Sequence, residues 1–323
     1  MGRMVPRKRR FPGLLLVALL LTGVARAEDW PCFRGPTGQG ISREKGVPTQ
    51  WSATAGLRWR TAVPGEGWSS PIVLGDRVFV TTALAGGSSL HLICFDRAGG
   101  QVVWDKEITR QKAGHKQSNN SYATPTPATD GRRIYVPVCD GRILAVSMEG
   151  ELVWTNADIE YYSEHGLAVS PVLYEDLVIV PFDGSSPPPN TKVGWQMPWD
   201  QAVILAVDRS SGQTRWKGSR GSSRIAHVTP RIVPVEDRDQ LVTGAGDVIQ
   251  GFDPETGARL WTVDSPGEGV VPSIVSGDGL VFTASGFGAS RVCAVRLGGQ
   301  GNVTKTHTVW ESREDVPKMS SLL

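Results

Sequence analysis

The sequence predicts an all-β fold, a β-propeller built from four-stranded antiparallel blades. Three observations predict it: a repeated turn motif that ends in tryptophan, a near-constant spacing between those tryptophans, and a composition rich in turn formers. The 323 residues include 38 glycines, 22 prolines and 11 tryptophans, which favours short strands joined by many turns over helices. After the N-terminal segment there is no apolar periodicity of 3.6 residues, so we expect no helix in the body of the chain.

The first 27 residues have the pattern of a secretory signal peptide. Residues 1–10 are basic, residues 14–25 form an apolar run too short to span a bilayer comfortably, and Ala25-Arg26-Ala27 fits the small-x-small cleavage pattern. Acidic and polar residues follow at once, which favours cleavage over the alternative of a retained membrane anchor. We therefore expect an exported protein, periplasmic or extracellular, with no stable membrane span after cleavage. The expected division is a signal peptide (1–27), an N-terminal extension (28–50) and a propeller (51–323).

The charge distribution argues against nucleic acid as a partner. The net charge is +2, but residues 1–27 hold six basic and no acidic side chains. The remaining residues carry 28 basic against 32 acidic side chains, a net charge of −4. Because binding to a phosphate backbone needs clustered lysine and arginine, we expect no nucleic-acid partner.

The four cysteines form no metal or haem motif. Cys94 and Cys293 lie in apolar strand patterns, where a free cysteine behaves as a small core residue. The spacing of the cysteines matches neither a zinc site nor a haem attachment site. Disulfide pairing stays open, because an exported protein is able to form such bonds.

The repeated motif has the form Asp-x-x-x-Gly-x-x-x-Trp. Three segments match it without gaps, and a fourth keeps only the spacing from glycine to tryptophan. These segments are 96–104, 208–216, 253–261 and 150–154. The tryptophans that end the repeats, from Trp59 to Trp310, are separated by 45, 50, 62, 45 and 49 residues, which is about the length of one four-stranded propeller blade.

Each repeat predicts its four strands in the same order. Small residues and proline precede a β-branched first strand, a Gly/Asp turn leads to the second strand, and a third apolar strand ends at the aspartate of the motif. In the first full copy these strands are 71–74, 78–81 and 90–95. The aspartate bonds its own downstream amides and the glycine adopts a positive φ. The fourth strand carries the tryptophan, which we expect to dock against the neighbouring blade. The residues expected at equivalent positions are Trp104, Trp154, Trp216 and Trp261.

This turn motif resembles the repeat of the PQQ-like β-propellers over roughly residues 51–316. That repeat builds quinoprotein dehydrogenases and also the propeller lipoprotein of the outer-membrane barrel-assembly machinery. Further stretches resemble a group of exported PQQ-like repeat proteins typical of planctomycete-type bacteria. These stretches are 29–36, 120–125, 198–201 and 223–227. The resemblance implies a fold without fixing an activity, because the function of a propeller lies in its site.

The count of repeats suggests an incomplete ring. Trp59 ends a last strand with no blade before it, five full repeats follow, and residues 316–323 have the pattern of the first strand of another blade. Because the resemblance implies seven or eight blades, we expect a ring that this chain does not complete. The alternative is a genuine six-bladed ring.

The resemblance does not carry a cofactor with it. Quinoprotein enzymes hold PQQ over the channel with a calcium ion, a catalytic aspartate and, in many, an adjacent cysteine pair. This sequence lacks the cysteine pair, and no compact set of oxygen ligands for calcium is apparent. We therefore expect no cofactor, no metal site and no catalytic residue, and PQQ is implied by the family resemblance alone.

Three histidines are candidates for a ligand site. His115, His165 and His227 lie just before or at the first strand of a blade, the strand that lines the channel in propellers. Three imidazoles at one channel mouth would suit metal binding or proton transfer. The alternative is that they are polar loop residues, since they come from different blades and lack a paired spacing such as HxH.

A long loop and a basic segment supply the remaining candidates. The connection 183–201 in the third full blade carries Trp195 and Trp199, which would stack on a sugar, a quinone or a peptide; alternatively the loop packs on itself. The segment 220–224 offers two arginines for an anion, or for structural ion pairs. We expect any ligand at the face that carries Trp199, Asp200, Arg224 and His227.

Three functions compete at this point. The first is an exported, non-catalytic propeller scaffold that binds a protein, a polymer such as a polysaccharide, or another envelope component. The second is a PQQ-dependent quinoprotein oxidoreductase, which rests on the resemblance. The third is a carbohydrate-associated binding protein that uses the loop with Trp195 and Trp199. The lack of a catalytic set favours the scaffold.

Overall fold

The computed structural model describes residues 1–2, 27–236, 238–285 and 287–323. The expected signal peptide lies, apart from its ends, outside these residues. Across the described ranges the chain is built from strands, with two short helical turns, η1 (Ala85–Gly87) and α1 (Thr304–His307). None of the described helices has the length and hydropathy needed to cross a bilayer.

The strands of the described residues form five successive antiparallel sheets, and within each sheet their spatial order follows the chain. The first sheet contains β1 (Ile72–Leu74), β2 (Arg77–Leu84), β3 (Ser89–Asp96) and β4 (Val102–Arg110). The second contains β5 (Ala128–Thr129), β6 (Arg133–Pro137), β7 (Ile143–Ser147) and β8 (Leu152–Asn156). The third contains β9 (Val172–Tyr174), β10 (Leu177–Phe182), β11 (Val203–Asp208) and β12 (Thr214–Ser219).

The fourth sheet has one strand more than the fifth. The fourth contains β13 (Arg231–Val235), β14 (Arg238–Ala245), β15 (Asp247–Phe252) and β16 (Arg259–Ser265). The fifth contains β17 (Val275–Gly277), β18 (Leu280–Ser285), β19 (Arg291–Arg296) and β21 (Thr308–Ser312). The short strand β20 (Gly301–Asn302) lies between β19 and β21 in the chain, but it joins the fourth sheet, where it pairs in parallel with β16.

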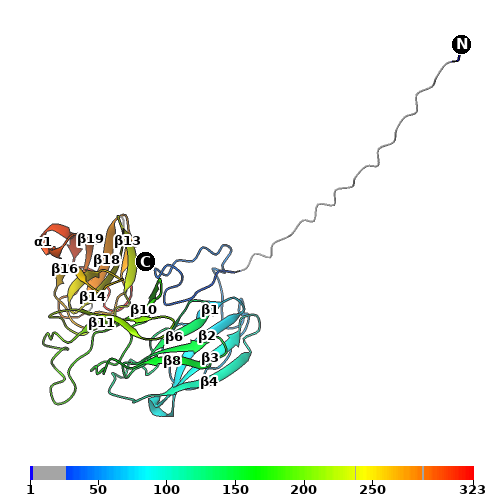
Figure 1. The fold of residues 1–323 in the computed structure, drawn as a ribbon, viewed down its shortest axis with the longest axis horizontal. Coiled ribbons are helices and arrows are strands. Elements are labelled where there is room, and N and C mark those ends of the chain that lie inside the picture. The colour runs from blue at the N-terminus through cyan, green and yellow to red at the C-terminus, as the bar shows by residue number, and fades with distance from the viewer. Residues whose placement is uncertain (3–26, 237, 286) are drawn as a thin grey trace.

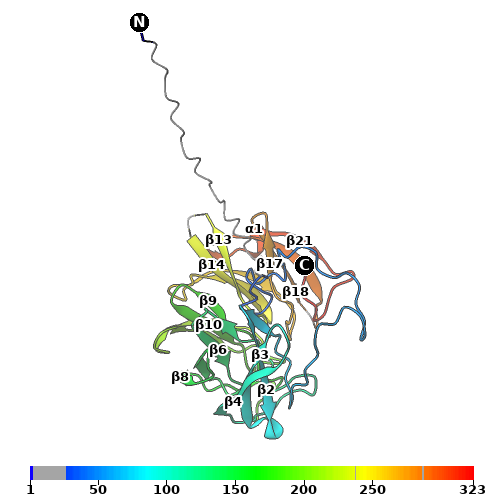
Figure 2. The ribbon, with the colours of Figure 1, turned by 90° about the vertical axis from the view of Figure 1, so that its right-hand side faces the viewer.

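The sheets follow one another around a common centre. In Figure 1 they run from the cyan first sheet through the green second and third sheets to the yellow and orange last sheets. The view turned by 90° shows the same order passing around the molecule (Figure 2). The all-β, propeller-like architecture expected from the sequence is thereby confirmed.

The apolar core is divided into layers between adjacent sheets. One cluster joins the first and second sheets through Phe79 and Ile134, and another joins the second and third through Tyr135 and Val178. The same holds for the third and fourth sheets and for the fourth and fifth. Burial of apolar area between neighbours therefore stabilises the array sheet by sheet.

Each outer strand carries its tryptophan at one register position. In all five sheets the residue that faces the tryptophan on the third strand is followed by a β-bulge. The pairs are Cys94–Trp104, Ala145–Trp154, Ala206–Trp216, Gly251–Trp261 and Ala294–Trp310. The shared bulge explains why one sequence spacing between glycine and tryptophan recurs.

Two segments expected to be strands are not strands in the structure. Trp59 lies in an extended segment without a ladder, because no third strand precedes it for pairing in the described residues. Its ring nevertheless takes the repeat position, and its Nε1 donates a hydrogen bond of 2.9 Å to the carbonyl oxygen of Arg97. Residues 316–323 also form no ladder; Ser321 Oγ accepts a hydrogen bond from Ser273 N, which holds the segment by a side chain instead.

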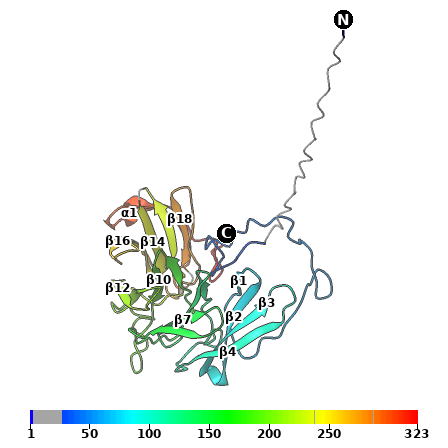
Figure 3. The same ribbon diagram turned by 45° about the vertical axis from the view of Figure 1, so that its right-hand side comes forward.

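The N-terminal extension crosses the inner strands. Trp30 pairs with Val73 of β1, and the carbonyl oxygen of Pro31 accepts a hydrogen bond of 2.9 Å from Thr129 N of β5. Further along, Gln39 Oε1 accepts a hydrogen bond from Ser276 N of β17. Figure 3 shows this blue segment between the first and the last sheets, near the C-terminus. The extension therefore links sheets that are distant in the sequence.

Candidate functional site

A pocket of about 540 Å³, here named the central pocket, lies where the segments that lead into the first strands converge. Trp68 precedes β1, Asn120 precedes β5, His165 precedes β9, His227 precedes β13 and Glu268 precedes β17. Every one of the five sheets thus contributes a side chain from the same kind of connection. A pocket at such a convergence is the default place for a ligand on a ring-shaped scaffold.

Two of the three candidate histidines meet in the central pocket. The rings of His165 and His227 contact edge to face with centroids 5.7 Å apart, and Trp195 lies edge-on to His165 at 5.4 Å. The backbone of His227 is fixed by a hydrogen bond of 2.7 Å from its N–H to the carbonyl oxygen of Val270. Within the described residues, the Nδ1 atoms of both histidines are buried and have no hydrogen-bond partner.

Both histidines are neutral near pH 7. Burial lowers the pKa of His227 to about 3, and the neighbouring His165 acts in the same direction. Burial also lowers the pKa of His165, against the attraction of Glu164 and Glu268. Loss of hydration penalises the charged imidazolium more than the neutral ring. The pair therefore offers neutral hydrogen-bonding groups to a ligand.

The third candidate histidine does not line the pocket. His115 is 49% exposed, and its Nε2 lies 3.5 Å from Glu164 Oε1. It approaches the pocket only through Glu164, which adjoins His165 in the chain. The structure thus brings together His165 and His227 and leaves His115 outside.

The two tryptophans of the long loop between β10 and β11 lie in different environments. Trp195 reaches the central pocket. Trp199 pairs its backbone with Ser223, and its ring packs against Gly194 of the same loop, where an added Cβ would lie 2.9 Å from the ring. Asp200 is exposed, and its Oδ1 accepts a hydrogen bond of 2.6 Å from Gln201. Trp195 is therefore the candidate ligand-binding residue, and Trp199 packs within the loop and stabilises it.

The two arginines of the basic segment are held in ion pairs. Arg220 is completely buried, and its Nε donates a hydrogen bond of 2.7 Å to Asp183 Oδ1 at the start of the long loop. Arg224 donates to Asp247 at 2.7 and 2.6 Å and lies 3.3 Å from Glu268. Among Trp199, Asp200, Arg224 and His227, only His227 lines the central pocket.

The sequence did not single out several residues that line the central pocket. Trp68 lies just before β1, and Asn119, Glu268 and Phe287 lie in connections between strands. Their shared signal is position, because all but Phe287 precede a first strand, as do the candidate histidines. Residue type alone gave no such signal.

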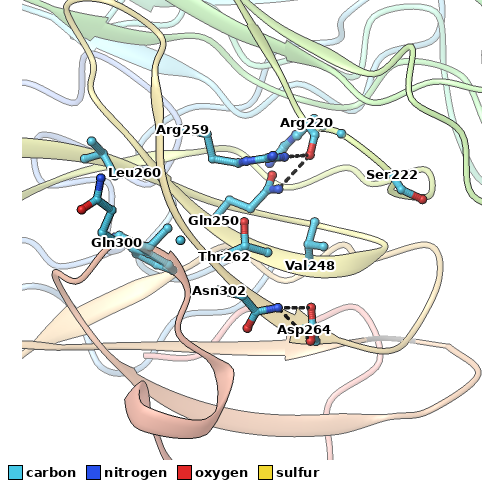
Figure 4. A pocket seen from close by; sticks show the side chains of 13 residues that line it. Arg220, Ser222, Val248, Gln250, Arg259, Leu260, Thr262, Asp264, Gln300 and Asn302 are labelled. Atoms are coloured by element: carbon cyan, nitrogen blue, oxygen red, sulfur yellow. Dashed lines mark hydrogen bonds between the residues drawn. The ribbon is translucent and has the colours of Figure 1, made fainter.

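A second pocket, of about 520 Å³, lies at the outer edge of the fourth sheet beside β16 and β20 (Figure 4). Several of its polar side chains are hydrogen-bonded to the backbone or to one another. Gln250 and Arg259 both donate to the carbonyl oxygen of Arg220, and Asn302 donates to Asp264. Within the described residues, Arg220 Nη1 and Gln250 Oε1 of this lining are buried without a hydrogen-bond partner. We take the central pocket as the candidate site because all five sheets contribute to it, whereas the second pocket lies at the edge of one sheet.

PQQ does not fit the groups of the central pocket. PQQ is a tricarboxylate, and recognition of carboxylates favours arginine or lysine as charge-assisted donors. Among the described residues no arginine or lysine lines the pocket, both histidines are neutral, and the one carboxylate, Glu268, is paired with Arg224 outside the lining. Among the described residues no group of three or more His, Cys, Asp or Glu side chains is arranged to hold a metal.

The ordered sheets, their shared tryptophan register and the central pocket define a PQQ-like β-propeller. Comparison with protein families matches residues 41–121 and 84–238 to the family described as outer membrane protein assembly factor BamB. The chain belongs to this family. The resemblance derived from the repeated turn motif is thereby confirmed.

Individual relatives agree on the fold. The chain is 25% identical over 282 residues to the quinoprotein glucose dehydrogenase of Escherichia coli K12, covering 79% of this chain and 29% of the relative. BamB from Moraxella catarrhalis superposes with a TM-score of 0.54 at 16% identity, covering 80% of this chain and 67% of that structure. The quinohemoprotein alcohol dehydrogenase of Comamonas testosteroni gives 0.62 at 16% identity, covering 86% and 49%. The chain thus spans less than a third of the length of its curated relative.

Proposed function

We propose that this chain is an exported, non-catalytic β-propeller scaffold that binds a protein, a polymer or another envelope component at the face of the central pocket. One observation carries the proposal: the pocket is lined by aromatic, amide and neutral imidazole side chains, and its carboxylate, Glu268, is already paired with Arg224. Such groups stack and form neutral hydrogen bonds. They do not supply the charges that binding of PQQ and a metal would need.

Family membership supports a protein partner and export. The matching family is described as an outer membrane protein assembly factor, which is compatible with a scaffold that holds other proteins. The division into a cleaved signal peptide (1–27), an extension (28–50) and a propeller (51–323) is part of the proposal. Periplasmic or extracellular localisation follows from it.

Photo-crosslinking tests where the partner binds. A crosslinking amino acid is placed at Met197 or Phe287, both exposed near the central pocket, and at Val153 on β8 as a control. We expect a defined adduct from the first two positions in the envelope of the expressing bacterium, and its loss when Trp195→Ala is added. Equal adducts at Val153, or none at Met197 and Phe287, would contradict the proposal.

The runner-up is a PQQ-dependent quinoprotein oxidoreductase, which the similarity to a quinoprotein glucose dehydrogenase favours. Purified protein is titrated with PQQ with and without calcium, and dye-linked alcohol and glucose oxidation are measured. We expect no turnover that depends on PQQ. Turnover that requires PQQ would overturn the scaffold and establish the oxidoreductase.

A carbohydrate-binding role is favoured by Trp195, which lies in one pocket with the amides of Gln117 and Asn119. An indole face and planar amides suit a sugar ring and its hydroxyl groups. A glycan array compares the wild type with Trp195→Ala, and with Trp51→Ala as a control at an exposed tryptophan outside the pocket. Glycan binding lost only in Trp195→Ala would support this role.

A further inference from the structure

A cavity of about 300 Å³, here named the extension cavity, lies between the N-terminal extension and the inner strands. Residues between Pro31 and Gly38 form one wall, and the opposite wall includes Val172 of β9, Ile232 of β13 and Ile274 just before β17. The extension cavity and the central pocket share no lining residue. Whatever binds in one is therefore independent of the function proposed for the other.

Two arginines from distant parts of the chain face the extension cavity. Arg34 belongs to the extension and Arg231 to β13. Arg34 donates to the carbonyl oxygens of Gln39 and Leu322 at 2.8 and 2.7 Å, and Arg231 donates to Ser276 Oγ at 2.9 Å and to the carbonyl oxygen of Thr37. All these acceptors are neutral, so the contacts neutralise neither charge.

Within the described residues, neither of these two guanidinium groups forms an ion pair with a carboxylate. No aspartate or glutamate lines the cavity. Burial raises the pKa of Cys32 to about 11, so this lining thiol is uncharged as well. Within the described residues the Nε of Arg34 is buried and has no hydrogen-bond partner. Burial lowers the pKa of both arginines, and Arg34 lowers that of Arg231 further by repulsion.

The other buried or partly buried arginines of the described residues have two kinds of partner. Arg224 bonds Asp247, and Arg291 lies 2.6 Å from Glu311. Arg77 and Arg133, in contrast, are partly buried and donate to backbone carbonyl oxygens, but neither lines the extension cavity. What distinguishes Arg34 and Arg231 is that both line one cavity whose lining holds no carboxylate, an arrangement that suits an anionic ligand.

The remaining lining residues indicate the chemical character of the uncharged part of that ligand. Prolines and aliphatic or aromatic side chains make up most of the wall, including Phe33, Pro171, Leu173 and Pro230. A fully hydrated inorganic ion would leave this apolar surface unused. An organic anion with an apolar body would bury it as well as meet the charges.

We propose that the extension cavity binds a small organic anion, with its carboxylate or phosphate group facing Arg34 and Arg231 and its apolar body against the inner strands. The site exists only because the extension lies over the sheets. Bound anion therefore links Arg34 to the fourth sheet and holds the extension in place. The same chemistry serves a free metabolite or the anionic end of an acyl chain.

Isothermal titration calorimetry of the full chain separates these sources. The probes are hexanoate, monohexyl phosphate, inorganic phosphate and hexanol, all at low ionic strength. We expect hexanoate or hexyl phosphate to bind at least tenfold more tightly than both hexanol and inorganic phosphate. Decanoate compared with hexanoate then distinguishes the two sources: tighter binding of decanoate indicates an acyl chain, and equal or weaker binding of decanoate indicates a short metabolite.

Variants locate the binding group. Arg34→Gln and Arg231→Gln each weaken hexanoate binding by tenfold or more, whereas Arg231→Lys keeps part of the affinity and Arg132→Gln, at an exposed arginine, leaves it unchanged. The wild-type comparison of hexanoate with hexanol decides the question even when a variant fails to fold. Equal affinities for these two probes, or unchanged binding in folded Arg34→Gln and Arg231→Gln, would overturn the proposal.

Discussion

The indole ring of Trp154 in the second sheet lies against Gly212, the turn glycine of the third sheet, and its Nε1 donates a hydrogen bond of 3.2 Å to the carbonyl oxygen of Arg209 in the same turn. Trp216 repeats the contact with Gly257 and the carbonyl oxygen of Pro254. Glycine and tryptophan of the motif therefore touch partners in adjacent sheets. One motif encodes both the turn of its own sheet and the docking between sheets.

Gly212→Ala tests this docking. An added Cβ would lie 2.6 Å from Cδ2 of Trp154, and Gly212 has a φ of +75°. We expect the free energy of unfolding to fall by about 2–4 kcal/mol, because overpacking adds to backbone strain. Gly131→Ala is the matched control, since its φ is +87° but nothing lies within 4 Å; it reports strain alone, about 1 kcal/mol. Equal losses in urea unfolding would show that the ring contact is unimportant.

Trp261→Ala tests the buried end of the repeat. Trp261 is 1% exposed and its Nε1 donates a hydrogen bond of 2.8 Å to Gln240 Oε1. Its loss leaves a cavity and an unpaired amide, and we expect a cost of about 3–5 kcal/mol. Trp310, which takes the same register position but is 45% exposed, is the control. Thermal unfolding midpoints that drop equally in the two alanine variants would be inconsistent with this reasoning.

Arg220→Met tests the buried ion pair. Arg220 and Asp183 are both fully buried. Removing the arginine therefore leaves a buried carboxylate with neither water nor a counter-charge. We expect a loss of about 3–5 kcal/mol. Arg220→Met combined with Asp183→Leu restores an uncharged interior and loses less than the single variant. A double variant that is less stable than Arg220→Met would mean that the pair itself, and not the stranded charge, sets the cost.

Local motifs made most of the fold predictable. The aspartate, glycine and tryptophan of each repeat interact within two neighbouring sheets, so their spacing is visible along the chain. Trp59 shows the limit: its motif spacing predicted a strand, but a strand needs a pairing partner. The ring contact with Gly100 formed without one.

The site was predictable only in part. His165 and His227 were found because their connections precede first strands, which fixes where they converge. Trp195 and Trp199 lie four residues apart in one loop, and no local pattern distinguishes the one that enters the pocket. The path of the loop depends on the backbone bond from Ile225 N to the carbonyl oxygen of Gly194, a contact between segments that no local pattern encodes.

His227→Gln tests the neutral histidine pair through pH. The pKa of His227 is about 3 in the folded protein against about 6.5 in an unfolded chain. Below pH 6.5 the unfolded state therefore binds a proton at His227 that the folded state does not bind. The stability that is present above pH 6.5 is lost as the pH falls towards 3. Between pH 7 and pH 5 this histidine accounts for a loss of about 1–2 kcal/mol, which His227→Gln should remove. Urea unfolding at both pH values measures it, with His307→Gln as the control away from the pocket. A pH dependence in His227→Gln as steep as in the wild type would show that His227 titrates alike in both states.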